Sequence, residues 1–163
     1  MAEITLARVD HRLIHGQVVT KWLKIAMAKK IIIIDDYLAK ETFMVDVYKM
    51  AAPSGVDVEI YSVEKALEEY NKNNFGNGNV FLLYKNVDMA YKTFKVGINY
   101  GKLQLGGIPS GAGKKMVFTA VSLDEKEVEQ LLEMQENNFK IDLHIVPEEN
   151  SITLDEAVKK FRG

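Results

Sequence analysis

Four consecutive β-branched residues, Ile31 to Ile34, constrain the fold of this 163-residue chain more than any other feature. A strand with one solvated face alternates apolar and polar residues, whereas this run contains no polar residue. Such a run is typical of a strand that is buried on both faces, as in a parallel sheet with helices on each side. The run therefore favours an α/β fold.

Short apolar runs alternate with longer amphipathic segments along the rest of the chain. In residues 17–28, apolar side chains recur at close to the i, i+3, i+4, i+7 spacing of a helix face. Strands are expected at residues 4–9, 31–34, 58–61, 80–83, 102–105, 115–121 and 141–146. Helices are expected at residues 17–28, 38–51, 63–70, 87–94, 123–134 and 153–161. This alternation predicts one domain, residues 1–163, with a doubly wound, mostly parallel open sheet of about six or seven strands and helices on both faces.

Composition excludes several classes of function. Lysine and arginine number 21, and aspartate and glutamate 23, so the net charge is −2. A nucleic-acid-binding protein usually carries a strong basic excess, so no nucleic-acid partner is expected. The chain has no cysteine, which excludes disulfides, thiol catalysis and cysteine-ligated metals. No apolar run approaches the roughly 20 residues of a membrane span, and the N-terminus does not resemble a signal peptide, so a cytoplasmic protein is expected.

The segment after the first expected strand, Arg8 to Gln17, holds the most reactive side chains. Ligands of parallel sheets bind beyond the carboxyl ends of the strands, which is where this segment lies. It contains two arginines, a carboxylate and two of the three histidines in the chain. His15 is followed by Gly16 and the expected helix, so its imidazole is predicted to lie beside the free N–H groups of a helix N-terminus, which bind anions.

These residue types suit the capture of a phosphoryl group. A neutral imidazole nitrogen of His15 is nucleophilic near pH 7. Arg8 and Arg12 supply planar, charged forks that match phosphate oxygens. Asp10 could accept a hydrogen bond from the second ring nitrogen of His15 and fix its tautomer. From these residues alone, a flavodoxin-like module that binds an anion without catalysis remains an alternative.

The run from Arg8 to Val18 resembles the active-site loop of one family of bacterial proteins. These are the IIB components of the phosphoenolpyruvate-dependent sugar phosphotransferase system (PTS), mannose/fructose/sorbose family. Trp22, Asp35-Asp36, Gly106-Gly107 and Val146-Pro147 extend the resemblance over essentially the full length of the chain.

The resemblance implies a complete reaction. His15 would take a phosphoryl group, at Nδ1, from a phosphohistidine on a IIA protein or domain. It would pass the group to a hexose of the mannose, fructose, sorbose or amino-sugar class, carried by the membrane subunits IIC and IID. The protein would be cytoplasmic, peripherally associated with the membrane permease, and would need no cofactor. The supporting phosphate-site residues would be Arg8, Asp10, Arg12, Gly16 and Gln17.

Other groups are expected to have lesser roles. His11 and His15 are four residues apart, but they lie in a predicted loop and not on one helix, so no metal site is expected. Because Asp is frequent in the family at the position of His11, that residue is not expected to be essential. His144 is expected to be structural or solvated. Asp35 or Asp36 is expected to pair with Arg8 or Arg12 across the strand ends.

The glycine-rich loop at residues 106–113 follows the fifth expected strand. Its glycines indicate either a mobile segment or a close approach of the backbone to another group. The sequence leaves both interpretations open.

Overall fold

The structure is a computed structural model that describes residues 2–163, including the side chains of all of these except Ala2, Gln17 and Val18. The strands are β1 (Ala2–Val9), β2 (Lys30–Ile34), β3 (Asp57–Tyr61), β4 (Gly78–Tyr84), β5 (Lys102–Leu105), β6 (Lys115–Phe118), β7 (Val121–Leu123), β8 (Lys140–Leu143) and β9 (Ile152–Thr153). The helices are α1 (Gly16–Ala26), the 3-10 turn η1 (Leu38–Lys40), α2 (Thr42–Met50), α3 (Val63–Asn73), α4 (Val87–Lys95), α5 (Glu125–Glu136) and α6 (Leu154–Arg162).

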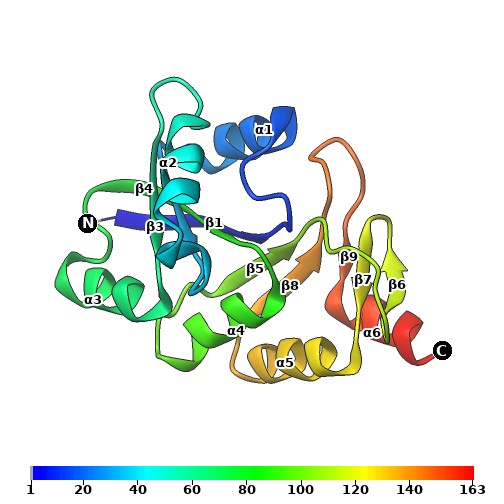
Figure 1. The fold of residues 1–163 in the computed structure, drawn as a ribbon. Coiled ribbons are helices and arrows are strands. Elements are labelled where there is room, and N and C mark those ends of the chain that lie inside the picture. Colours follow the sequence, from blue (N-terminus) through cyan, green and yellow to red (C-terminus); the bar gives the residue numbers. More distant parts are fainter. Residues whose placement is uncertain (1) are drawn as a thin grey trace.

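Within residues 2–163, seven strands form the main sheet in the order β3-β2-β4-β1-β5-β8-β9. All neighbouring strands run parallel except β8 and β9, which are antiparallel. Helices α1 and α2 lie on one side of this sheet, and α3, α4 and α5 lie on the other (Figure 1). The predicted α/β fold with a mostly parallel sheet is therefore confirmed. No helix in the described part of the chain is long and apolar enough to span a bilayer.

The isoleucine run explains how both faces of the sheet are packed. All four residues from Ile31 to Ile34 are fully buried. Ile31 and Ile33 belong to the core cluster that also contains residues of α1, whereas Ile32 and Ile34 belong to the cluster that contains residues of α3, α4 and α5. Since side chains alternate between the faces of a strand, a run with no polar residue requires a helix layer on each side.

The predicted strand at residues 115–121 is wrong. The segment forms a hairpin, β6 and β7, whose two antiparallel strands make a separate sheet. The chain reverses at Thr119 and Ala120, and Ala120 has a left-handed φ of 61°. Alanine is not a residue that marks such turns, so the apolar pattern reads as one continuous strand. This also delays the next helix, because Leu123 pairs in β7 and the Asp124 side chain caps α5.

Two other boundaries differ from the sequence prediction. The helix expected at residues 38–51 is interrupted at Glu41, which separates η1 from α2. The strand expected at residues 141–146 ends at Leu143. As described below, main-chain carbonyls just beyond Leu143 bind side chains of β1 and α1 instead of extending the sheet.

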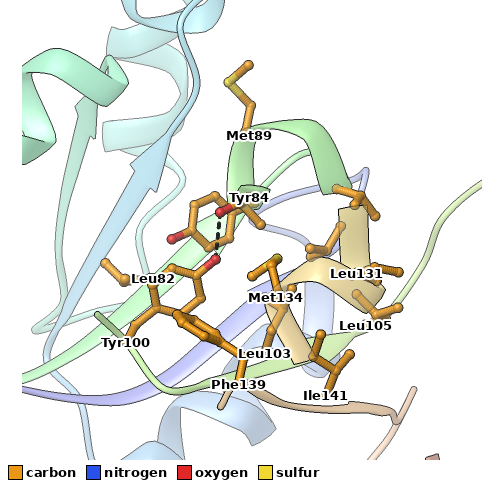
Figure 2. Close-up of a cluster of buried hydrophobic side chains, with 14 of the residues drawn as sticks. Leu82, Tyr84, Met89, Tyr100, Leu103, Leu105, Leu131, Met134, Phe139 and Ile141 are labelled. Atoms are coloured by element: carbon orange, nitrogen blue, oxygen red, sulfur yellow. Dashed lines mark hydrogen bonds between the residues drawn. The ribbon is translucent and has the colours of Figure 1, made fainter. Parts of the chain in front are cut away.

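The core between β4, β5, β8 and α5 holds the central strands in place (Figure 2). Leu82, Leu103 and Leu131 are all buried in this cluster. The hydroxyl groups of Tyr84 and Tyr100 lie together inside this core, and Tyr100 donates a hydrogen bond of 2.7 Å to the Ala90 carbonyl. Burial raises the pKa of both phenols, so they stay neutral.

Leu131 gives a direct test of this core. Replacing it with alanine should lower the free energy of unfolding by about 2–5 kcal/mol, because a fully buried side chain is lost and a cavity remains. Met50→Ala is the matched control, since the Met50 side chain is 86% exposed. Urea unfolding should show a change of about 0.5 kcal/mol or less for that variant. Equal losses in the two variants would contradict this packing.

Candidate functional site

The loop between β1 and α1 lies at the carboxyl edge of the sheet, where the sequence places it. Main-chain hydrogen bonds attach it to neighbouring strands: Asp10 N donates to the Tyr84 carbonyl at the end of β4, at 2.9 Å. His11 N donates to the Gly107 carbonyl after β5, at 2.8 Å. Leu13 N donates to the Asp10 carbonyl, and the Leu13 side chain is fully buried. The loop is therefore fixed at both its start and its centre.

His15 is the N-cap residue of α1, but its side chain does not cap the helix. The first N–H groups of α1 therefore remain without a side-chain acceptor from His15, as an anion site requires. The ring Nδ1 lies 3.0 Å from the Leu13 carbonyl oxygen, and Nε2 lies 3.9 Å from Oδ2 of Asp10. Gly16 follows with a left-handed φ of 44°, a conformation that suits glycine.

Asp10 is the centre of the site. Its carboxylate is fully buried and accepts hydrogen bonds from Nη2 of Arg8 at 3.3 Å and from the Arg12 main-chain N–H at 3.1 Å. Nε of the Arg12 side chain lies 3.7 Å away, and Nδ1 of His11 lies 4.0 Å away. The structure therefore brings three predicted site residues, Arg8, Arg12 and His15, around one carboxylate, although the Asp10–His15 contact is longer than a hydrogen bond.

The guanidinium of Arg8 is enclosed by protein. Nη1 donates to Oε1 of Gln104 and, at 2.7 Å, to the His144 carbonyl. Nη2 donates to Asp10 and, at 3.0 Å, to the Ile145 carbonyl. Burial lowers the pKa of Arg8 and the neighbouring Asp10 opposes that shift, so the guanidinium keeps its charge. All four Nη hydrogens are used, so Arg8 supports Asp10 and has no free fork for a phosphate.

Arg12 is placed differently from Arg8. Its side chain is 50% exposed, beside the buried Asp10. A half-exposed guanidinium can meet an anion from outside without breaking a buried hydrogen-bond network. Of the two predicted arginines, Arg12 is the one whose position suits contact with a phosphoryl group.

Sequence reasoning assigned no site role to Gln104 or Trp22. Gln104 is a buried amide between Leu103 and Leu105, and this polar residue inside an apolar strand was the available signal. The Trp22 ring covers the guanidinium of Arg8 at 5.2 Å, and its Nε1–H donates to the Ile145 carbonyl at 3.1 Å. Nothing in their spacing along the sequence indicates that these residues meet Arg8.

The glycines after β5 allow the main chain to pack closely against Arg8 and His11. A Cβ atom on Gly106 would lie 2.3 Å from Nη2 of Arg8. This distance is too short for two non-bonded atoms, so any side chain at this position would displace Arg8. The Gly107 carbonyl accepts from the His11 main chain and lies 3.0 Å from Nδ1 of the His11 ring. This segment therefore packs directly against the site, which decides between the two interpretations of its glycines.

Asp35 and Asp36 do not take part in the site. Oδ1 of Asp35 accepts from the main-chain N–H groups of Tyr37 and Leu38, and Oδ1 of Asp36 accepts from Val63 N at 2.8 Å. In the described part of the chain neither forms an ion pair with an arginine, so that prediction is wrong. Asp35 satisfies N–H groups at the start of η1 and Asp36 one N–H at the start of α3, roles that a paired Asp-Asp sequence does not distinguish from a binding site.

The His144 ring packs edge-on against Trp22, with centroids 4.9 Å apart, and its Nε2 lies 2.7 Å from the Glu149 carbonyl, so its role is structural as expected. Gln17 begins α1 with its backbone, but its side chain lies outside the described part of the structure.

A groove of about 640 Å³ opens beside His15 along α1. It is lined by Ile14, His15, Gly16, Val19, Thr20, Lys21, Lys24, Ala51 and Pro53. Lys21 and Lys24 place positive charge along it, and Lys21 binds Glu148 at 2.9 Å. Because Glu148 offsets the charge of Lys21, it is Lys24 that favours the approach of an anionic group along this groove.

The family of this chain follows from comparison with known proteins. The model of the family described as "PTS system sorbose subfamily IIB component" matches residues 4–162, nearly the whole chain. The chain belongs to this family. As a PTS IIB component it is a sugar phosphotransferase, a phosphoryl-transfer component for sugar transport, and a non-catalytic anion-binding module is not favoured.

Several curated proteins are similar to this IIB component. The PTS system sorbose-specific EIIB component of Lacticaseibacillus casei is 41% identical over 143 residues, covering 88% of this chain and 87% of the relative. The protein of the same name from Klebsiella pneumoniae is 34% identical over 158 residues, covering 97% and 96%. The mannose-specific EIIAB component of Escherichia coli (strain K12) is 30% identical over 158 residues, which are 97% of this chain and 49% of that protein.

Solved structures show the same fold. The crystal structure of manxB from Thermoanaerobacter tengcongensis has a TM-score of 0.92 and 38% identity, covering 100% of this chain and 99% of that chain. The IIBSor domain of the sorbose permease from Klebsiella pneumoniae has a TM-score of 0.90 and 35% identity, covering 96% and 97%. The α/β architecture of this IIB component is thus that of its family.

The close approach at Gly106 leads to a prediction about stability. Gly106→Ala should lower the free energy of unfolding by about 3 kcal/mol, because the new methyl group displaces Arg8 and leaves the Asp10 carboxylate buried without its partner. Trp22, the only tryptophan, stacks on Arg8, so its fluorescence reports both the unfolding transition and the displaced guanidinium.

Gly111→Ala is the control for this substitution. It lies in the same loop, and the nearest atom to its added Cβ is 3.8 Å away, an ordinary contact. Its unfolding midpoint and native Trp22 spectrum should match those of the wild type. A Gly106→Ala variant as stable as Gly111→Ala would contradict the enclosure of Arg8.

Proposed function

We propose that His15 is the phosphorylated residue of this IIB component, taking a phosphoryl group from a IIA phosphohistidine and passing it to a hexose. The observation that supports this role is the convergence at His15 of a helix N-terminus, the buried Asp10 carboxylate and the half-exposed Arg12. The sorbose and mannose named for the relatives indicate the class of sugar. The combined EIIAB relative supports a IIA donor.

The same proposal includes the protein's surroundings. Residues 1–163 act as one IIB domain in the cytoplasm, peripherally associated with the membrane permease. The subunits IIC and IID of that permease hold the sugar that accepts the phosphoryl group. These partners lie outside this chain, which supplies the carrier histidine and its positioning residues.

The proposed transfer is an exchange of one nitrogen–phosphorus bond for another. The N–P bond of the donor histidine breaks as the bond from Nδ1 of His15 to phosphorus forms. Charge on the transferring oxygens is stabilised by the guanidinium of Arg12 and by main-chain N–H groups at the start of α1, where Gly16 and Gln17 lie. In the second half-reaction the bond to His15 breaks and a sugar hydroxyl oxygen takes the phosphorus, losing its proton.

Substitution of His15 tests the proposal directly. His15→Ala should abolish labelling by pre-phosphorylated IIA, because His15 lies at the N-terminus of α1, whereas the more exposed His11 ring lies against the Gly107 carbonyl. In the wild type the label should be acid-labile and base-stable, as a histidine N–P bond is. Circular dichroism should show an unchanged fold, since a loop residue contributes little to the core.

His11→Ala is the matched control, since it removes the other imidazole beside Asp10. Its labelling should continue, slowed about tenfold at most, the effect of losing one ordinary hydrogen bond. Full labelling of His15→Ala, or complete loss in both variants, would contradict the assignment of His15 as the sole carrier.

Arg12 gives a second test. Arg12→Ala should slow transfer from IIA by about 10²-fold, because one charge-stabilising donor is lost from the transition state. Arg12→Lys should recover only part of the rate, since an ammonium group lacks the planar fork. Arg162→Ala is the matched control, because that side chain is similarly exposed, at 54%, but lies in the C-terminal helix. Equal rates for Arg12→Ala and Arg162→Ala would exclude a role for Arg12 in transfer.

A further inference from the structure

The His15 ring has both of its nitrogens turned toward the protein. Nδ1 lies 3.0 Å from the carbonyl oxygen of Leu13. A carbonyl oxygen only accepts hydrogen bonds, so this contact places a proton on Nδ1. Nε2 is fully buried, has no hydrogen-bond partner and lies 3.9 Å from Oδ2 of Asp10. Neither nitrogen therefore presents a lone pair to the surface.

This orientation blocks phosphorylation at either nitrogen. On Nδ1 the lone-pair direction is occupied by the proton that Leu13 accepts. On Nε2 that direction leads into the protein toward the buried carboxylate of Asp10, so a donor protein cannot reach this nitrogen. The ring must move before it can react.

The backbone of Leu13 holds the ring in this orientation. Leu13 has a φ of 57°, in the left-handed region that a branched, bulky residue rarely adopts. Its side chain is fully buried, and its N–H donates to the Asp10 carbonyl at 2.9 Å, so packing and a hydrogen bond maintain the unusual conformation. Such backbone strain recurs at sites where it has a functional role.

The groove beside α1 provides room for the ring to rotate. Ile14, Gly16, Val19 and Thr20 line it next to His15, and no atom lies within 4 Å of the position where a Cβ on Gly16 would be. A ring turned into this groove leaves the Leu13 carbonyl and exposes Nδ1 to a donor protein.

We propose that Leu13 is a positioning residue for His15: its carbonyl holds the Nδ1 proton in the unphosphorylated protein, and transfer requires the ring to rotate off it into the groove. On rotation the Nδ1 proton passes to water while Nε2 takes up a proton from water, so the ring stays neutral and the lone pair on Nδ1 attacks phosphorus, after which Nε2 returns its proton to solvent. The donor N–P bond breaks at the same time, and the donor imidazole regains a proton from solvent. This inference rests on the proposed role of His15 and describes how the reactive nitrogen is uncovered.

The resting protein alone tests the first part. Long-range ¹H–¹⁵N correlation spectra of ¹⁵N-labelled protein, recorded where the ring is neutral, distinguish a protonated ring nitrogen from a bare one. The chain has three histidines, so spectra of His11→Ala and His144→Ala identify the signals of His15. We expect a protonated Nδ1, the reverse of the tautomer that predominates in free histidine. A bare Nδ1 with a protonated Nε2 would overturn the proposal.

A matched pair of variants tests the part played by the Leu13 backbone. Leu13→Ala and Leu13→Gly both remove the same buried side chain, but only glycine also frees the main chain. The Nδ1 proton of His15 should exchange with water about two- to fivefold faster in Leu13→Gly than in Leu13→Ala, the factor expected from the greater backbone freedom of glycine. Equal exchange rates would overturn the role of the Leu13 conformation.

These measurements separate the two proposals. Neither uses phosphate, so failure of wild-type labelling at His15 would remove the proposed function and leave the tautomer result unaffected. Labelling at His15 together with a bare Nδ1 in the resting protein would retain the carrier function and remove the positioning role of Leu13.

Discussion

The site depends on one buried ion pair, between Arg8 and Asp10. Two charges removed from water are tolerated only if each is compensated and hydrogen-bonded, and here both are. Arg8 binds Gln104 on β5 and two carbonyls after β8, while Asp10 binds the main chain of Arg12. The pair therefore connects β1, β5 and the loop after β8 to the segment that carries His15. The position of that segment depends on both charges of the pair remaining matched.

This arrangement places rigid and accessible groups side by side. The carboxylate of Asp10 and the guanidinium of Arg8 are fully buried, whereas Arg12 is half exposed and His15 lies between these extremes. A carrier of phosphoryl groups must meet two successive partners, so its reactive side chain has to be reachable while its supports stay fixed. The strand ends and the buried Leu13 supply the fixed part, and the His15 ring is the part that moves in the proposed transfer.

The sequence predicts what depends on local pattern. The run Ile31 to Ile34 indicates a strand with helices on both faces of its sheet. The order of His15, Gly16 and an amphipathic segment indicates that His15 lies at a helix N-terminus. Patterns do not reveal partners that are far apart in the chain: Gln104 is 96 residues from Arg8, and the His144 carbonyl is 136 residues away. The loop composition therefore places Arg8 among the residues that bind or support a phosphate, but it does not reveal the buried contacts of Arg8 with Gln104 and two distant carbonyls. The turn at Ala120 is missed for a different reason, since its left-handed conformation is maintained by pairing of β6 with β7 and not by residue type.

The unused cap at the start of α1 has a consequence for how the site withstands genetic change. His15 occupies the N-cap position, but its side chain accepts no hydrogen bond from the helix. The N–H groups of the first helical turn are therefore not occupied by the His15 side chain. Most substitutions leave a peptide N–H in place, and only proline removes one. The N–H groups that the proposed phosphoryl site uses therefore do not depend on which side chains α1 carries, as long as its first turn contains no proline.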